Sequence, residues 1–136
     1  MSKRRVLIVD DTPATIDLTA FVLDAGGFAV QSATDADSVM LQVQLFKPDL
    51  ILMDVQMPGV DGLELTRRLK ADPSTRHIVV VAFTAFAMSG DEAKMRAAGC
   101  DGYIAKPFDV ASFAQTVDAH IRACGDSEAT TEIGLC

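Results

Sequence analysis

The sequence predicts an α/β fold in which five β-strand and α-helix units form one doubly wound parallel sheet. Short apolar runs alternate five times with segments of helical periodicity along the chain. The run from Leu50 to Met53 is apolar at consecutive positions, which is typical of a strand covered on both faces. The chain has 136 residues, 49% of them hydrophobic, so it can form one domain with a full core, and five such units leave no room for a second.

The first unit begins with the apolar run Val6 to Val9, which we expect to form a strand. Thr12 and Pro13 are typical of an N-cap followed by the first residue of a helix, and Gly26–Gly27 indicates where that helix ends. The next run, Phe28 to Val30, is short and only weakly apolar, so we place it at an edge of the sheet.

The second helix leads into the strand at 50–53. Asp35 or Asp37 can cap its N-terminus, and Pro48 stops it. Its buried face is expected to consist of the apolar residues at helical spacing, which are Val39, Val43 and Phe46.

The next two units follow the same plan. A third helix is expected from about Asp61 to Lys70, and a second fully buried strand from Ile78 to Phe83. Ser89 is a candidate N-cap for a fourth helix that ends at Gly99. Its buried stripe is expected at Ala93 and Ala97, which predicts shallow packing and easy movement.

The last unit has a short strand at 103–105, and Asp109 is expected to cap its helix. The apolar face of that helix is expected to comprise Val110, Phe113, Ala114, Val117 and Ile121. Residues 1–124 thus form the predicted domain, and the polar residues 125–136 are expected to be a mobile tail. Right-handed crossovers and strand hydrophobicity favour the strand order 2-1-3-4-5.

Polar side chains follow four of the predicted strands: Asp10 and Asp11, Asp54, Thr84, and Lys106. The carboxyl ends of parallel strands meet at one edge, where open α/β sheets place their ligands. Three crowded carboxylates repel one another, and a divalent cation with hard oxygen ligands, Mg²⁺, removes that repulsion. An Asp in such a site can accept a phosphoryl group, whose oxygens Lys106 and Thr84 could then bind.

Each of these residues also has a purely structural interpretation. Asp11 and Thr12 could simply cap the first helix, and Thr84 could cap backbone groups in a loop. Asp54 alone could be a loop carboxylate, and Lys106-Pro107 alone could be a turn. Because all of them fall at strand carboxyl ends in one alternating pattern, we favour the functional site.

The composition excludes several classes of protein. A net charge of −7 argues against nucleic-acid binding, which needs a basic surface. No segment resembles a membrane span, and the apolar run after Lys3-Arg4-Arg5 is too short for a signal peptide, so we expect a cytoplasmic protein. Cys100, Cys124 and Cys136 lack metal-ligand spacing and are expected to be reduced thiols, with a disulfide-linked dimer through Cys124 or Cys136 as the alternative. His77 and His120 stand alone and are expected to be ordinary histidines.

The chain resembles the receiver domains of two-component response regulators, the CheY-like superfamily, from residue 4 to about 122. The segments at 84–88 and 100–103 look most like stand-alone DivK-type and hybrid-kinase receivers. The motifs that carry the resemblance are Val9-Asp10-Asp11, Leu52-Met53-Asp54 with Met57-Pro58-Gly59, Phe83-Thr84-Ala85, and Tyr103-Ile104-Ala105-Lys106-Pro107-Phe108. The resemblance implies a flavodoxin-like (βα)5 three-layer sandwich.

The resemblance also implies roles for individual residues. Asp54 would be the phosphoacceptor, and Asp10, Asp11, Asp54 and the backbone carbonyl of Gln56 would hold Mg²⁺, with Mn²⁺ as an alternative ion. Lys106 would pair with the phosphoryl group, next to a cis peptide bond between Lys106 and Pro107.

Further implied roles concern switching and signal lifetime. Thr84 and Tyr103 would form a coupled switch, in which the hydroxyl moves toward the phosphoryl group and the ring turns inward. The side chains of Gln56 and Phe86 would tune the lifetime of the phosphorylated state. The phosphoryl donor would be a histidine kinase or a histidine phosphotransfer protein. The signal would leave through a downstream protein, or through self-association, at the fourth helix, fifth strand and fifth helix.

Two alternatives come from other classes. An aspartate-nucleophile phosphohydrolase of the haloacid dehalogenase kind resembles the setting of Asp54, but it needs a second Asp where this chain has Gln56. A flavodoxin-like flavin-binding module would need a Ser/Thr-rich phosphate-binding loop after the first strand, where this chain has acids. We therefore expect a phosphorylation switch rather than an enzyme with its own substrate.

Overall fold

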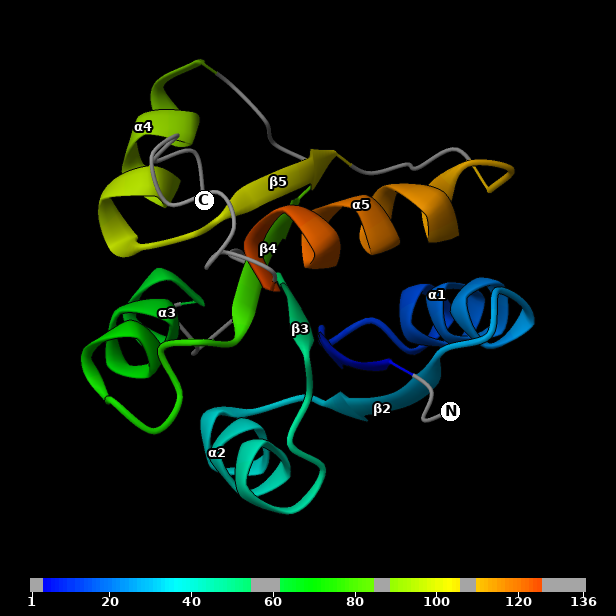
Figure 1. The fold of residues 1–136 in the computed structure, drawn as a ribbon, viewed down its shortest axis with the longest axis horizontal. Helices are drawn as coiled ribbons and strands as arrows, with labels where there is room; N and C mark the ends of the chain where they lie inside the picture. The colour runs from blue at the N-terminus through cyan, green and yellow to red at the C-terminus, as the bar shows by residue number, and fades with distance from the viewer. Residues whose placement is uncertain (1–3, 55–61, 85–88, 106–109, 126–136) are drawn as a thin grey trace.

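A computed structural model describes residues 4–54, 62–84, 89–105 and 110–125 of the chain, without the side chains at 84, 89–92, 94, 105 and 123–125. Five strands and five helices alternate along it (Figure 1). The strands are β1 (Arg5–Val9), β2 (Ala29–Ala33), β3 (Leu50–Met53), β4 (Val79–Thr84) and β5 (Gly102–Ala105). The helices are α1 (Pro13–Ala25), α2 (Ala36–Leu45), α3 (Gly62–Ala71), α4 (Ser89–Ala98) and α5 (Phe113–Gly125).

The strands form one parallel sheet in the order β2-β1-β3-β4-β5, so the predicted fold and strand order are confirmed. α1 and α5 cover one face of the sheet, and α2, α3 and α4 cover the other (Figure 1). The weakly apolar β2 lies at an edge, as predicted, whereas all four residues of β3 are fully buried. The helices on both faces of the sheet explain why β3 is more buried than β2, because a strand can be apolar at every position only where both faces are covered.

Alternate residues of each central strand pack into two separate cores. On the α1 and α5 side, Leu50 and Leu52 of β3 pack with residues that include Leu23 and Phe113. On the opposite side, Ile51 and Met53 of the same strand join a second cluster of buried residues. Successive side chains of a strand point to opposite faces, so one apolar run contributes to the core under both layers of helices.

Most predicted helix boundaries agree with the structure. Thr12 is the N-cap of α1, with Pro13 as its first helical residue, and Gly26 is the C-cap. Asp35, rather than Asp37, caps α2, and its carboxylate accepts a 2.7 Å hydrogen bond from the amide of Ser38. This carboxylate binds the orphan amides of the first helical turn, and these hydrogen bonds lower its pKa.

The predicted buried face of α4 is wrong, and that of α5 is wrong only at Val110, since Phe113, Val117 and Ile121 are buried as predicted. In α4, Ala93 and Ala97 are exposed, and among the described side chains of this helix the buried ones are Met95 and Ala98. At 100° per residue, Met95 and Ala98 share one face of the helix, and Ala93 and Ala97 lie on the opposite face. The larger apolar side chain, Met95, therefore decides which face of α4 is turned toward the core. Val110 is 54% exposed, because it lies in a turn before the first helical residue of α5.

The start of α5 explains the error at Val110. The carbonyl of Ser112 accepts the amide of Thr116 at 2.9 Å, so the helical hydrogen bonds begin there. Val110 has the helical spacing of Phe113 and Val117, so the sequence pattern alone cannot show that α5 begins after Val110. The predicted cap, Asp109, lies outside the described residues, as do residues 126–136 of the predicted tail.

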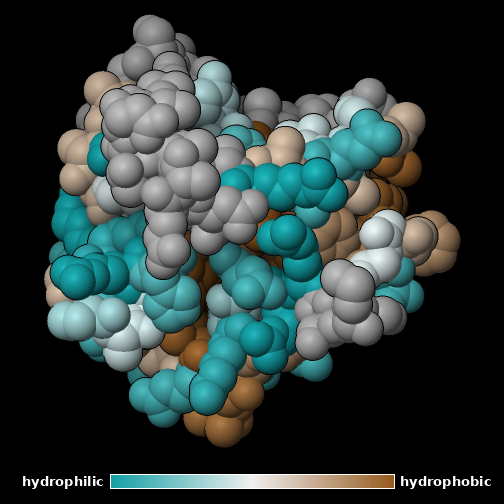
Figure 2. All heavy atoms as spheres, viewed as in Figure 1, coloured by the Kyte–Doolittle hydropathy of each residue, from teal (hydrophilic) through white to brown (hydrophobic). Residues whose placement is uncertain are grey.

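Large apolar side chains also lie on the outer surface. Figure 2 shows hydrophobic atoms over α1 at the right and over α2 at the bottom of the view. The exposed residues are Leu18 and Phe21 on α1, and Leu41 and Leu45 on α2. No described helix is both long enough and apolar enough to cross a membrane.

Candidate functional site

The pairing of β1 with β3 positions Asp10 beside Asp54. Val9 and Met53 are partners at the end of the two strands, and each is followed by an aspartate. The backbone pairing continues one step further, since the amide of Asp54 donates to the carbonyl of Val9 at 2.9 Å. The amide of Asp10 likewise donates to the carbonyl of Ala33 at 3.2 Å, which ties the end of β1 to β2. Backbone hydrogen bonds thus hold both residues at the carboxyl edge of the sheet.

Asp10, Asp11 and Asp54 form a cluster in which one carboxylate oxygen of each lies within 4.8 Å of the others. Asp10 is fully buried and Asp54 is 6% exposed, whereas Asp11 is exposed. Carboxylates are seldom buried to this extent outside functional or paired sites. The predicted acidic cluster is therefore present, with two acids inside the sheet edge and one at its surface.

The hydrogen bonds made by the side chain of Thr12 do not support the interpretation that Asp11 and Thr12 only cap the first helix. Thr12 occupies the N-cap position of α1 but makes no side-chain capping hydrogen bond. Its hydroxyl instead lies 3.5 Å from a carboxylate oxygen of Asp11. Its amide donates to Asp10 Oδ1 at 3.0 Å, so the backbone at the start of α1 helps to orient the buried carboxylate.

The donor set fits a magnesium ion. Octahedral Mg²⁺ at about 2.1 Å from its ligands places neighbouring oxygens about 3 Å apart and opposite ones about 4 Å apart. The spread within the cluster, at most 4.8 Å, is only slightly wider. Three carboxylates also leave coordination positions for water, as this ion prefers.

Tyr103 lies on β5, in register with Ala82 of β4. Paired residues point to the same face of a sheet, and Ala82 belongs to the core beneath α2, α3 and α4, so Tyr103 is on the α4 side. Its side chain is 40% exposed. The backbone of Thr84 pairs with Ala105 at the carboxyl end of the same two strands.

The remaining predicted site residues fall where the structure gives no side-chain description. The side chain of Thr84 and all of Gln56, Phe86, Lys106 and Pro107 lie outside the described residues. Their predicted roles, including the cis peptide bond, stay predictions. Of the cysteines, Cys100 is a buried free thiol whose pKa burial raises, and the side chains of Cys124 and Cys136 lie outside the described part.

Sequence reasoning did not single out Lys70, which connects three segments beside α4. Its ammonium donates to the carbonyl of Ile78 and to Asp101 Oδ2, each at 2.7 Å, and to the carbonyl of Arg76 at 3.2 Å. Asp101 Oδ2 also accepts the amide of Val80 at 2.9 Å. A lysine in the last turn of a helix usually points to solvent. The sequence therefore gives no sign of the ion pair with Asp101, which becomes apparent only because Lys70 is half-buried in the structure.

Comparisons with known proteins agree with this geometry. The sequence model of the response regulator receiver domain matches residues 6–118. The chain is 40% identical over 118 residues to the polar-differentiation response regulator DivK of Brucella anthropi, an alignment that covers 87% of this chain and 96% of that protein.

Solved structures give the same result. A CheY-like response regulator receiver domain protein from Methanospirillum hungatei superposes with a TM-score of 0.83 at 25% identity, covering 93% of this chain and 99% of that one. The receiver domain of a signal transduction histidine kinase from Syntrophus aciditrophicus superposes with a TM-score of 0.78 at 29% identity, covering 88% of this chain and 91% of that one. These matches favour the receiver over the phosphohydrolase and the flavin-binding module. The chain belongs to the response regulator receiver domain family of two-component signalling systems, and it is homologous to DivK.

Proposed function

We propose that Asp54 is the phosphoacceptor of a Mg²⁺-dependent signalling switch. The observation that carries the proposal is the convergence of Asp10, Asp11 and Asp54 within 4.8 Å at the carboxyl edge of β1 and β3. Asp54 is the one acid of the cluster that follows the central strand β3, which is buried at all four positions. Its backbone hydrogen bond to Val9 fixes its position relative to the other two acids.

The chemistry is a phosphoryl transfer from a phosphohistidine on a histidine kinase or a phosphotransfer protein. A carboxylate oxygen of Asp54 attacks phosphorus, an O–P bond forms, and the P–N bond breaks with its electron pair left on the imidazole ring. The carboxylates of Asp10, Asp11 and Asp54, with the backbone carbonyl of Gln56, would hold Mg²⁺ (or Mn²⁺). When bound, such an ion would neutralise negative charge on the phosphoryl oxygens.

The chain's own residues supply the remaining functions. Lys106 would bind a phosphoryl oxygen as a fixed cation, and the hydroxyl of Thr84 would hydrogen-bond another. Gln56 and Phe86 would control the access of water to the acyl phosphate. The unit that carries these residues is residues 1–124.

The signal would leave through α4, β5 and α5, toward a protein target or a second copy of the chain. Tyr103 on β5 supports this assignment because it is partly exposed and because only one strand, β4, separates β5 from β3. Its ring would turn inward as Thr84 moves toward the phosphoryl group, which changes the surface that a partner contacts. Couplings of this kind are typically about 1–3 kcal/mol.

Acetyl phosphate tests the proposal without a cognate kinase. With Mg²⁺, the wild-type protein should gain the mass of one phosphoryl group, and EDTA should abolish the gain. Asp54→Asn should gain none, whereas Asp24→Asn, which removes an exposed carboxylate on α1, should behave as wild type. A gain that persists in Asp54→Asn would refute the assignment of the phosphoacceptor.

A further inference from the structure

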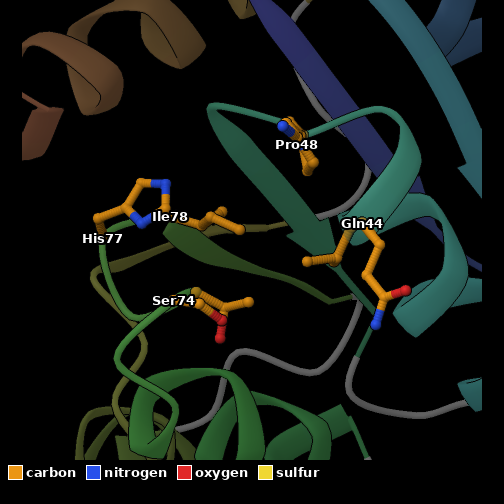
Figure 3. A pocket seen from close by; sticks show the side chains of 8 residues that line it. Gln44, Pro48, Ser74, His77 and Ile78 are labelled. Carbon is orange, nitrogen blue, oxygen red and sulfur yellow. The ribbon is translucent and has the colours of Figure 1, made fainter.

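A cavity of about 450 Å³ lies at the opposite end of the sheet from the acidic cluster. It opens between the end of α2 and the turn that precedes β4 (Figure 3). Pro48, which lines it, comes before β3, and Ile78, which also lines it, comes before β4. Asp54 follows the other end of β3, so the cavity and the acidic cluster are separated by the length of that strand.

The inner wall of the cavity is apolar. Val43 of α2 is 5% exposed, Ile78 is 2% exposed, and Pro48 is also buried. Figure 3 shows His77 and Ile78 on the β4 side and Gln44 on the α2 side, with Pro48 at the top of the view. A wall of this kind favours the apolar part of a ligand, since the ligand leaves water on binding.

Two hydroxyl groups at the cavity are already engaged within the protein. Thr75 Oγ1 donates to the carbonyl of Leu69 at 2.6 Å, and Ser74 Oγ donates to Asp72 Oδ1 at 2.8 Å. The amide of Ser74 also donates to the same Asp72 oxygen at 2.9 Å, and the two bonds lower the pKa of that carboxyl. Neither hydroxyl hydrogen is therefore directed to a ligand, and other side chains must supply the polar contacts.

The outer rim carries two basic side chains, Lys47 and His77, both exposed. Lys47 supplies a positive charge in a chain whose net charge is −7, and the imidazole of His77 can donate a hydrogen bond. Lys47 also has a φ of 53°, in the left-handed region. That conformation costs a non-glycine residue about 1 kcal/mol, and Gly or Asn would adopt it at lower cost.

We propose that this cavity binds a small organic anion with an apolar body. The acidic head, a carboxylate or a phosphate, lies between Lys47 and His77, and the body packs on Val43, Pro48 and Ile78. The volume is within the range of small-molecule sites, about 300–1,000 Å³, which favours such a ligand over a folded partner. The proposed ligand site does not depend on phosphorylation at Asp54, because its residues lie at the amino ends of the strands and Asp54 lies at a carboxyl end.

Three probes of matched shape test the proposal by amide NMR titration of the full chain: 1-naphthylacetate, 2-(1-naphthyl)ethanol and 2-(1-naphthyl)ethylamine. The acetate should shift amide signals at 43–47 and 74–78 and should bind at least tenfold more tightly than the amine. The neutral alcohol should bind with intermediate affinity at the same place. The proposal is overturned if the acetate shifts no signals in these two segments, or if the amine binds equally well.

Substitutions distinguish the contribution of the head-group contacts to binding from that of the apolar wall. Lys47→Gln and His77→Gln should each weaken binding of the acetate several-fold and leave binding of the alcohol unchanged. Arg68→Gln, which removes an exposed cation on α3, should bind the acetate as wild type does. Asp54→Asn should also bind normally, so failure of the phosphoacceptor assignment would not affect this result. Unchanged acetate binding in both Lys47→Gln and His77→Gln would refute the proposed head-group site.

Discussion

Lys70 Nζ and Asp101 Oδ2 lie 2.7 Å apart and join the end of α3 to the turn before β5. Their side chains are only 21% and 12% exposed, and each makes at least one further hydrogen bond to the backbone around β4. The pair therefore links α3 and the start of β4 to the strand that carries Tyr103. Removing one partner of a partly buried, hydrogen-bonded ion pair leaves an uncompensated charge, so it costs more stability than removing one partner of an exposed pair.

We predict that Lys70→Met destabilises the fold by about 2 kcal/mol, because it leaves the Asp101 carboxylate without its cation. A double-mutant cycle with Asp101→Asn, measured by urea denaturation, should give a coupling energy of about 1–2 kcal/mol. Arg122 and Asp118 form the control, since they are also 2.7 Å apart but Arg122 is 69% exposed. Their coupling should stay near about 0.4 kcal/mol. Equal coupling in the two pairs would contradict the structural role of Lys70.

A second prediction concerns repulsion in the acidic cluster. Asp11→Asn should raise the free energy of unfolding of the metal-free protein by about 1 kcal/mol, because it removes one of three neighbouring charges. The same change should weaken Mg²⁺ binding about tenfold or more, as measured by isothermal titration calorimetry. A lower metal-free stability with unchanged Mg²⁺ affinity would mean that Asp11 only supports the start of α1.

The third prediction follows from His120, whose ring covers Gly102 of β5 from the α5 side. A Cβ atom at position 102 would lie 2.6 Å from His120 Cε1, so any larger residue there would displace the imidazole ring. Burial lowers the pKa of His120 from its usual 6.5, and the nearby Asp101 opposes this shift. Because the unfolded chain binds the proton more readily, stability present above about pH 6.5 is lost as the pH falls below it. His120→Gln should lose less stability than wild type between about pH 7.5 and pH 5.5 in thermal melts. Identical losses would show that His120 titrates as it does in the unfolded chain.

The fourth prediction concerns signal lifetime. Phe86 is bulky and should exclude water from the acyl phosphate, whereas Gln56 could orient a water molecule. Exclusion removes the nucleophile altogether, so we expect it to dominate. Phe86→Ala should speed dephosphorylation several-fold, or about 1 kcal/mol in the barrier. Decay of the phosphorylated protein in Mg²⁺ without kinase measures this, and equal or slower decay in the variant would exclude a shielding role.

The central part of the fold could be predicted because its signals are local. The apolar run 50–53 and the acid that follows it identify a buried strand with a polar residue at its carboxyl end, and the structure has both. Asp10 and Asp11 are similarly local to the end of β1. Since parallel strands place their carboxyl ends together, the acidic cluster follows from topology without any knowledge of distances.

The errors and omissions depend on tertiary contacts. In α4, the choice between Ala93 and Met95 for the buried face depends on which side packs against α3 and β5, and a helix with few apolar residues gives a weak periodic signal. Lys70 and Asp101 are 31 positions apart in the chain, and no sequence spacing indicates that they meet. The cavity between Val43 and Ile78 likewise depends on how closely two segments approach.

Chemical trapping of the phosphorylated residue tests the central claim most directly. The protein is phosphorylated with acetyl phosphate and Mg²⁺, reduced with borohydride, which converts an aspartyl phosphate to homoserine, and digested for peptide mass spectrometry. We predict homoserine at position 54 and unmodified aspartate at positions 10 and 11, which would act as metal ligands. Homoserine at position 10 or 11, or its absence from position 54 in protein that has gained a phosphoryl group, would contradict the account.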